Sequence, residues 1–293
     1  MKKITLALGG GGSKGIAHIG VIKALQANEI KIAAVAGTSI GSVIASMLAL
    51  GLTPEKMADE FRSVDQSRMF GAPFSDGAGF LGYGSIKEVL MRVLGEATFD
   101  DVKIPLKVVS VDLVSDSVVE ITQGRLIDAV LASIAIPGFF PPRYMGDMVL
   151  VDGGVMDPVP VRSARSLFPD LPCVAVPLSG KYRFSQLNPI PMAAGNWSNI
   201  LVEQFSRTTL SKAFTVMSDA VDTTSRQVAE LRLEIDRPDI IIRPKVEKFG
   251  ILDTVDIDEM VRLGQESAAE NIGQVKRAGN VFFGLYKMIS GEK

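Results

Sequence analysis

The sequence predicts an α/β protein in three layers, in which helices cover both faces of a mostly parallel central sheet. Two observations predict this fold class. Residues 3–8 (KITLAL) and 31–36 (KIAAVA) are apolar runs of strand length, and each is followed by a glycine-containing turn and a helical pattern of apolar residues. A strand, a helix and a second strand in this order form a parallel βαβ unit, whose helices pack on the faces of the sheet.

The other elements follow in chain order. The first two helices are expected from Ser13 to Ala27 and from the second turn to about Leu50, and Thr53 is an N-cap residue for a third helix that begins at Pro54. Further strands are expected at residues 105–123 (two strands around a turn at 115–116), 148–154, 172–178 and 239–244. Further helices are expected at residues 84–94, 125–133 and 256–289. Residues 197–233 contain no Pro or Gly, which fits either one long helix or two broken ones.

Residues 62–83 (RSVDQSRMFGAPFSDGAGFLGY) interrupt the alternation of strands and helices, and they contain glycines, a proline and apolar side chains. Loops of this length are usually lids, binding loops or disordered segments, so we expect either a lid or pocket rim, or a plain surface loop. The chain has no low-complexity linker, repeat or shift in composition. We therefore expect one domain over residues 1–293, with its core at about 4–180 and a C-terminal strand and helices at about 236–289 packed on it.

The composition excludes several classes of function. The chain of 293 residues contains 31 Lys and Arg against 33 Asp and Glu, so no basic footprint indicates a nucleic-acid partner. Cys173 is the single cysteine and His18 the single histidine. These counts exclude intrachain disulfides, cysteine-based zinc sites and most transition-metal sites. We expect neither a metal nor a cofactor.

The N-terminal stretch MKKITLALGGGG has two lysines followed by an apolar run, as a signal peptide does. That run extends only from Ile4 to Leu8 and ends in glycines, which is too short for an export signal. No apolar segment reaches the roughly 18–20 residues of a membrane span. We therefore expect a soluble, cytoplasmic protein.

The glycine loop GGGGSKG, residues 9–15, follows a strand and opens a helix. Its G-x-G-x-x-G spacing matches a dinucleotide fingerprint, but that site needs an acidic residue at the end of the second strand, and Glu29 precedes the strand. A phosphate-binding P-loop needs Gly-Lys-Ser/Thr, whereas the order here is Ser-Lys-Gly. Consecutive backbone amides at a helix start suit an anion or a transition-state oxyanion. The alternative is that the glycines only allow close packing of helix on strand.

Two G-x-S-x-G patterns compete for the role of nucleophile elbow, in which a serine lies at the apex of a strand–turn–helix. At Ser39 the strand runs directly into Gly37, and Gly41 follows as the helix begins. At Ser13 four glycines intervene and the serine occupies an N-cap position. Ser39 is therefore the predicted nucleophile, and Ser13 belongs to the glycine loop.

The residue that activates Ser39 is expected to be a carboxylate. His18 precedes the serine, whereas the histidine of a hydrolase triad follows it, and its apolar neighbours indicate a structural role. In the predicted strand at 148–154, Asp152 follows the apolar run MVLV and precedes Gly153 and Gly154, which leave space in front of its carboxylate. The ordinary pKa of an aspartate lies about 2.5 units below that of a histidine, a gap that desolvation narrows. The alternative for Asp152 is an ordinary Asp-Gly turn.

Taken together, these blocks resemble the patatin-like phospholipase family. The family's G-G-G-x-[RK]-G block occurs at residues 10–15, its G-x-S-x-G elbow at 37–41 and its D-G-[GA] acid block at 152–154. The segment SIAIPGFFPP, residues 133–142, is similar to the proline-containing segment that precedes the acid block. The blocks occur in the family's order with about its spacing.

The match extends from residue 4 to about 180, and the strand near 241–244 and the helix after it are similar to the bacterial, single-domain branch. The resemblance implies that Ser39 is the nucleophile and Asp152 its partner, in a dyad without histidine. It also implies an oxyanion hole formed by the amides of Gly11 and Gly12, with that of Gly10. Lys14 stands at the family's Arg/Lys position, and we assign it no chemistry.

The family hydrolyses acyl esters of phospholipids, lysophospholipids or neutral lipids, so the resemblance implies a patatin-like serine acyl hydrolase that contacts membrane surfaces transiently. Four apolar residues of the 62–83 loop are then expected to line an acyl groove: Met69, Phe70, Phe74 and Phe80. Two alternatives remain, a lipid- or nucleotide-binding regulator with weak or lost catalysis, and a transacylase in which an alcohol intercepts the acyl-enzyme. The sequence does not indicate the oligomeric state or the head group.

Overall fold

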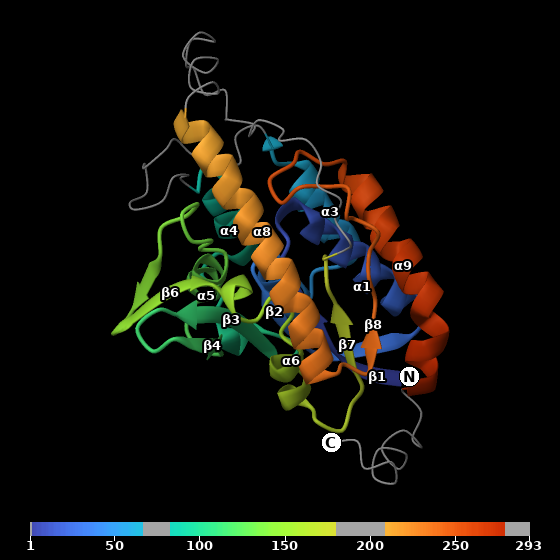
Figure 1. The fold of residues 1–293 in the computed structure, drawn as a ribbon. Coiled ribbons are helices and arrows are strands. Elements are labelled where there is room, and N and C mark those ends of the chain that lie inside the picture. Colours follow the sequence, from blue (N-terminus) through green and yellow to red (C-terminus); the bar gives the residue numbers. More distant parts are fainter. Residues whose placement is uncertain (1, 67–82, 180–208, 279–293) are drawn as a thin grey trace.

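The computed structural model describes residues 2–66, 83–179 and 209–278, and these form a mixed sheet of eight strands (Figure 1). The strand order is β5-β6-β3-β2-β1-β7-β8, and β4 also pairs with β3. The strands are β1 (Lys2–Leu8), β2 (Ile30–Thr38), β3 (Leu106–Asp112), β4 (Ser117–Ile121), β5 (Arg143–Met145), β6 (Met148–Asp152), β7 (Cys173–Val176) and β8 (Ile240–Ile241).

The predicted parallel part of the sheet is confirmed. Strand β1 pairs in parallel with β2 and β7, β2 with β3, and β7 with β8. The edge beyond β3 is antiparallel, because β4 and β6 both run against β3 and β5 runs against β6. Strand β5 has only three residues and was not predicted from the sequence, and the predicted strand at 239–244 is reduced to the two residues of β8.

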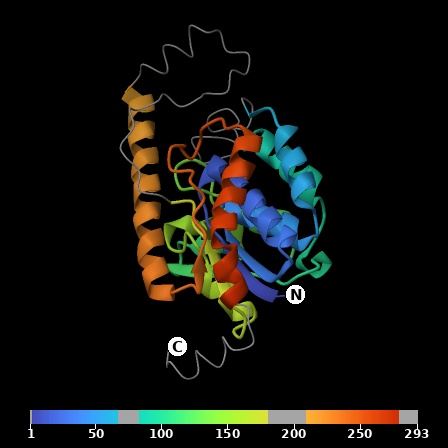
Figure 2. The same cartoon turned by 90° about the vertical axis from the view of Figure 1, so that its right-hand side faces the viewer.

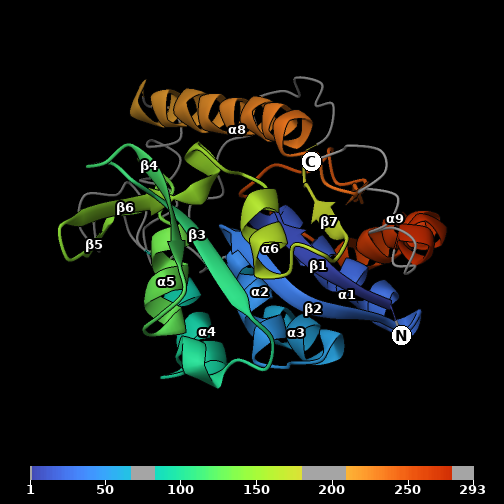
Figure 3. The same cartoon turned by 90° about the horizontal axis from the view of Figure 1, so that it is seen from below.

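Helices cover both faces of the sheet, which gives the predicted three layers (Figure 3). Helices α6 and α8 lie on one face, while α1 to α5 lie on the other, and α9 packs against α1 (Figures 1 and 2). The helices are α1 (Ala17–Ala27), α2 (Ile40–Ala49), α3 (Pro54–Arg62), α4 (Ser85–Leu94), α5 (Leu126–Ser133), α6 (Val161–Leu167), α8 (Thr209–Asp236) and α9 (Ile257–Ala278). Within the described ranges, the short 3-10 turns are η1 (Gly12–Ile16), η3 (Phe99–Asp101) and η4 (Gly153–Val155).

The two faces of the sheet carry side chains of different size. In β1, the large side chains Ile4, Leu6 and Leu8 belong to the main core beneath α1 and α2, whereas the alternating residue Ala7 faces a smaller cluster. Successive side chains of a strand point to opposite faces, so this alternation follows directly from the sequence KKITLAL. The small residues on the α6 and α8 side leave room for these helices close to the sheet.

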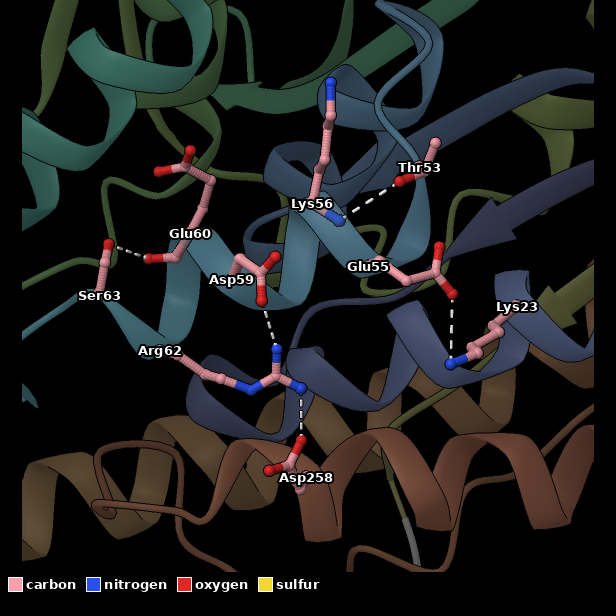
Figure 4. A network of polar contacts seen from close by, with 9 residues as sticks. All are labelled: Lys23, Thr53, Glu55, Lys56, Asp59, Glu60, Arg62, Ser63 and Asp258. Atoms are coloured by element: carbon pink, nitrogen blue, oxygen red, sulfur yellow. Dashed lines mark hydrogen bonds and ion pairs between the residues drawn. The ribbon is translucent and has the colours of Figure 1, made fainter.

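Helix α3 confirms the predicted cap and shows how the helices on this face are tied together (Figure 4). The Thr53 hydroxyl accepts a hydrogen bond from the Lys56 amide at 3.3 Å, and Pro54 occupies the first turn. The carboxylate of Glu55 pairs with Lys23 of α1, and the Arg62 guanidinium bridges Asp59 and Asp258 of α9. These exposed pairs each contribute little to stability, but they join three helices on one side of the sheet.

The C-terminal elements β8, α8 and α9 complete the sheet and the helical layers on its faces. Helix α8 is a single helix of 28 residues, the first of the two alternatives left open for the segment without Pro and Gly, and α9 covers the first part of the predicted helix at 256–289. Helix α6 was not predicted, because its sequence VRSARSL is short and only partly apolar. The segments 197–208 and 279–289, also predicted to be helical, lie outside the described residues.

Candidate active site

Ser39 lies at the apex of the sharp turn between β2 and α2. Its backbone φ of 54° and ψ of −130° are values that non-glycine residues rarely adopt. The flanking glycines allow the turn, because a Cβ atom at Gly37 would lie 2.3 Å from the Gly41 carbonyl oxygen and one at Gly41 would lie 2.2 Å from that of Leu8. The strand–turn–helix expected for the elbow is therefore present at Ser39.

The Ser39 hydroxyl donates a hydrogen bond of 2.6 Å to Oδ2 of Asp152. The other carboxylate oxygen, Oδ1, accepts a hydrogen bond of 2.7 Å from the Gly154 amide, which fixes the orientation of the carboxylate. Both side chains are nearly enclosed, with 6% of Ser39 and 5% of Asp152 exposed. Gly153 is needed because a Cβ there would lie 2.5 Å from the Val109 carbonyl oxygen.

Burial brings the pKa of Asp152 closer to neutral pH. Desolvation of the carboxylate raises the pKa of Asp152 to about 6, and the hydrogen bonds from Ser39 and Gly154 oppose this rise because they stabilise the charged form. At pH 7 a carboxylate with this pKa is mostly ionised.

The register of the sheet brings these two residues together. Thr38, the last residue of β2, pairs with Val109 of β3, and the next residue of β3, Ser110, pairs with Asp152. Strand β4 occupies the other side of β3 from Val108 to Asp112, so β6 takes the side that β2 leaves free. The C-terminal ends of β2 and β6 therefore meet head to head beside β3.

The glycine loop follows β1 and lies against the elbow, since a Cβ at Gly10 would lie 3.1 Å from that of Ser39. The Gly10 amide differs from its predicted role, because it donates a hydrogen bond of 2.9 Å to the Pro158 carbonyl. Gly12 has a φ of 59°, and a Cβ at this position would lie only 1.9 Å from the Ile251 carbonyl oxygen. The main chain of residue 251 therefore closes the outer side of the loop.

His18 occupies the structural position that its apolar neighbours predict. The ring is fully buried, and its Nε2–H donates a hydrogen bond of 2.8 Å to the Gly9 carbonyl. Burial lowers the pKa of His18 to about 4, so the ring is neutral at pH 7. Its hydrogen bond supports the start of the glycine loop and does not go to Ser39.

The structure adds contacts that the sequence analysis did not identify. The Ser39 amide donates a hydrogen bond of 2.9 Å to the Ser133 hydroxyl, which in turn donates to the Val109 carbonyl. Ser133 is the first residue of the SIAIPGFFPP segment, but nothing in that pattern indicated a contact with the elbow.

The Thr38 hydroxyl donates to the Asp157 carbonyl, and the Asp157 carboxylate lies 3.5 Å from Arg232 of α8. Burial raises the pKa of Asp157 to about 7.

The comparison with protein families assigns the chain. A model described as patatin-like phospholipase matches residues 6–165, which is more than half of the chain. The chain belongs to the patatin-like phospholipase family. An uncharacterized NTE family protein of Mycobacterium tuberculosis is 33% identical over 206 residues, which are 70% of this chain and 57% of the relative. Lysophospholipase NTE1 of Pyricularia oryzae is 26% identical over 95% of this chain and 19% of its own length.

This patatin-like chain therefore spans just over half of its mycobacterial relative and under a fifth of the fungal one. Among solved structures, VipD of Legionella pneumophila matches 94% of this chain and 67% of its own, with a TM-score of 0.48 and 14% identity. The type III effector ExoU matches 95% of this chain and 54% of its own, with a TM-score of 0.46 and 14% identity.

Two cavities of the patatin-like fold meet at Ser39. The larger one, of about 400 Å³, lies beneath α8, and its walls include the glycine loop, Asp152 and Gly154. The smaller one, of about 130 Å³, lies between α2, α3 and α4 and the segments 134–140 and 251–257, and its walls are mostly apolar. Ser39 and Gly12 belong to the walls of both cavities.

Lys14 belongs to the wall of the larger cavity and has a structural partner there. Its Nζ lies 3.6 Å from Oδ1 of Asp222, and Oδ2 of the same carboxylate lies 3.3 Å from the guanidinium of Arg226. Burial lowers the pKa of Lys14, although Asp222 opposes this effect. The cluster connects the glycine loop to α8.

The predicted acyl-groove residues Met69, Phe70, Phe74 and Phe80 lie in the segment 67–82, outside the described residues. Within the described ranges, no group of three or more His, Cys, Asp and Glu side chains has a geometry that could hold a metal ion. None of the helices in the described part of the chain is both long and apolar enough to cross a bilayer.

Proposed function

We propose that this chain is a serine hydrolase of lipid acyl esters, with Ser39 as nucleophile and Asp152 as general base. The observation that carries the proposal is the 2.6 Å hydrogen bond between the Ser39 hydroxyl and Oδ2 of Asp152 at a strained strand–helix turn. A nucleophile within hydrogen-bond reach of a base that is itself oriented by a third group is the arrangement that covalent catalysis requires. Here Gly154 orients the base.

In the acylation step, Ser39 Oγ attacks the ester carbonyl carbon while Asp152 takes the hydroxyl proton. The carbonyl π bond opens, and the tetrahedral intermediate carries the negative charge on the former carbonyl oxygen. When the intermediate collapses, the bond to the alcohol oxygen breaks, and Asp152 returns the proton to this oxygen. The alcohol leaves, and the acyl group remains on Ser39 as an ester.

Deacylation repeats these steps with water as nucleophile. Asp152 takes a proton from the attacking water, the second tetrahedral intermediate forms, and its collapse breaks the bond to Ser39 Oγ. The proton passes from Asp152 to Ser39 Oγ, so the carboxylic acid leaves and the enzyme returns to its starting state. One carboxylate therefore serves as base and then as acid in both halves of the reaction.

The oxyanion hole that we propose consists of the backbone amides of Gly11 and Gly12. These residues line the cavity that also contains Ser39 and Asp152, and they are the N-cap and the first residue of η1. Amides at the start of such a turn lack an acceptor within it, so they are available to a developing negative charge. The Gly10 amide is engaged by the Pro158 carbonyl and holds the loop in place.

The comparisons support a lipid ester as the substrate class. The matching family model is named for phospholipases, and the fungal relative that covers 95% of this chain is named a lysophospholipase. The apolar walls of the cavity beside Ser39 are consistent with an acyl chain. A water-soluble ester and a lysophospholipid are therefore the first substrates to test.

The test is to label the protein with a fluorophosphonate, which reacts with activated serines, and to assay both substrates. Ser39→Ala is expected to abolish labelling and turnover, and Asp152→Asn to reduce both by at least about 10³-fold. Ser13→Ala is the matched control, because Ser13 lies in the other G-x-S-x-G pattern and its hydroxyl donates to the Gly250 carbonyl. Labelling and turnover that persist in Ser39→Ala would overturn the proposal.

A further inference from the structure

Helix α8 turns one of its faces toward the catalytic pair. Val221, Ser225 and Ala229 follow one another at intervals of four residues, so they lie on one face of the helix. All three belong to the wall of the larger cavity at Ser39, and Ala229 is buried in the small cluster on this side of the sheet. Helix α8 also packs against η4, the turn that contains Gly154. The half-buried Ser225 side chain therefore faces the cavity from the helix that covers it.

The Ser225 hydroxyl lies close to the carboxylate of Asp152. A Cβ atom placed on Gly154 would lie 3.0 Å from Oδ1 of Asp152 and 3.5 Å from Oγ of Ser225. The two oxygens are therefore separated by no more than the sum of these lengths, which is about the distance that one water molecule bridges with two hydrogen bonds. Both residues border the same cavity, so one water molecule has access to the two groups at once.

The Ser225 hydroxyl has no hydrogen-bond partner among the described residues. A serine within a helix commonly donates to the carbonyl four residues earlier, as Ser267 of α9 does to the Leu263 carbonyl. The charged neighbour Asp222, one turn earlier on α8, is engaged by Lys14 of the glycine loop. Ser225 therefore presents a hydroxyl to the cavity that the protein itself leaves available to a ligand.

Water and an alcohol bring different numbers of hydrogens to the acyl-enzyme. Each gives one hydrogen to Asp152 when its oxygen attacks the acyl carbon. Water has a second hydrogen, which stays on the oxygen and leaves with the carboxylic acid. In an alcohol a carbon group occupies this place. A second hydrogen-bond acceptor beside Asp152 therefore holds an attacking water molecule and has no hydrogen to accept from an alcohol.

We propose that the Ser225 hydroxyl accepts a hydrogen bond from this second hydrogen, and that it favours hydrolysis of the acyl-enzyme over transfer to an alcohol. This inference rests on the proposed function of Ser39 and Asp152. A water molecule ordered in a protein has two to four polar partners, and these two side chains supply two. Held between them, the water directs a lone pair at the acyl carbon on Ser39.

The hydroxyl positions the water and transfers no proton. The water oxygen forms a bond to the acyl carbon, and one of its O–H bonds breaks as Asp152 takes the proton. Collapse of the intermediate breaks the bond to Ser39 Oγ, which receives the proton from Asp152. Ser225 keeps its own hydrogen throughout and contributes through the orientation of the nucleophile.

The experiment measures how the acyl-enzyme divides between two acceptors. The full chain reacts with p-nitrophenyl butanoate in the presence of methanol, and the butanoic acid and methyl butanoate are quantified. Both products come from one acyl-enzyme, so their ratio does not depend on the rate at which Ser39 is acylated. Ser225→Ala is expected to lower the rate of acid formation about three- to ten-fold, as the loss of one hydrogen bond does. The ratio of methyl ester to acid should rise by the same factor.

Two further measurements distinguish the positioning of water from a general loosening of the site. Labelling of Ser39 by fluorophosphonate needs no water, so Ser225→Ala should be labelled at the wild-type rate. The butanoyl group on Ser39, detected as added mass of the intact protein, should accumulate in this variant because only its breakdown is slowed. Gln227→Ala is the matched control, since Gln227 is exposed on the same helix and lies outside the cavity wall. It should keep the wild-type product ratio.

The outcomes separate this inference from the function on which it rests. The inference is wrong if Ser225→Ala keeps the wild-type ratio of products, whether or not the overall rate falls. It is also wrong if labelling and hydrolysis fall by the same factor, because the substitution then affects Ser39 itself. An equal change of the ratio in Gln227→Ala would assign the effect to α8 as a whole and would also contradict it. If the wild type hydrolyses no ester and Ser39 is not labelled, the proposed function itself fails.

Discussion

The hydroxyl of Ser39 and the carboxylate of Asp152 are joined by a 2.6 Å hydrogen bond although they lie 113 positions apart in the chain. The contact has no histidine between its partners, and the single histidine is instead buried against the Gly9 carbonyl. A carboxylate of ordinary pKa is a weak base, and enclosure of Asp152 reduces this deficit.

The rate of acylation should depend on the protonation of Asp152. Because burial raises the pKa of Asp152 to about 6, the carboxylate is protonated and inactive below that pH, and kcat/KM should rise about ten-fold per pH unit up to about 6 and then level off. The measurement is a pH–rate profile with a p-nitrophenyl ester.

His18→Gln provides the control for this profile. It removes a neutral ring whose pKa of about 4 lies well below the expected break, so the break should stay near pH 6 even if the rate falls. A break near pH 4 in the wild type would show that Asp152 behaves as an exposed carboxylate. Loss of the break in His18→Gln would identify the histidine as the titrating base.

Gly12→Ala should reduce activity strongly. The new methyl group would overlap with the Ile251 carbonyl oxygen at 1.9 Å, so the loop must shift and the Gly12 amide changes its position relative to Ser39. Loss of one oxyanion donor lowers kcat by about 10²–10³-fold, and a fall of this size is expected. The measurement is kcat for the short-chain ester, with circular dichroism to verify folding.

Gly124→Ala is the matched control for Gly12→Ala. Gly124 also has a positive φ, of 86°, but nothing lies within 4 Å of a Cβ placed there. The backbone cost of a methyl group at positive φ is therefore common to both variants, and only the clash differs. Equal activities of the two variants would contradict a role for the position of the Gly12 amide.

Ser39→Gly should be more stable than Ser39→Ala. Both variants lose the hydrogen bond to Asp152, but glycine adopts a φ of 54° and ψ of −130° without the strain that a Cβ atom imposes. The expected difference in the free energy of unfolding is about 1 kcal/mol, measured by urea denaturation. Equal stabilities would mean that the elbow is not strained at Ser39.

Ser133→Ala should lower kcat about three- to ten-fold while KM changes little. The Ser133 hydroxyl accepts the hydrogen bond of the Ser39 amide, so its loss leaves a buried donor without a partner at the elbow and lets the nucleophile shift. Ser133 acts here as a positioning residue. The measurement is the separation of kcat from KM with the short-chain ester.

Ser110→Ala is the control for Ser133→Ala. The Ser110 hydroxyl is equally buried, and it donates to the Val151 carbonyl on the neighbouring strand. Its removal should lower stability by a similar amount but leave kcat close to that of the wild type. If both variants lose the same activity, the effect is general loosening of the sheet and not positioning of Ser39.

Elements with strong local signals could be predicted from the sequence. The runs KITLAL and KIAAVA form strands β1 and β2. Thr53 caps helix α3, and the segment without Pro and Gly before Leu233 forms most of the long helix α8. The elements that were not predicted are short. Strand β5 and helix α6 have three and seven residues, which is too short to show a clear period of apolar side chains. Their formation depends on the neighbouring elements against which they pack.

By itself, the sequence determined the residue types available for chemistry and their local geometry. One serine lies between two glycines at a strand end, one aspartate stands before two glycines, and no histidine follows either. Only the tertiary structure decided that β6 runs antiparallel on the side of β3 that β2 vacates, which places Asp152 beside Ser39. Strand direction and pairing depend on contacts between distant segments, and local residue patterns do not encode such contacts.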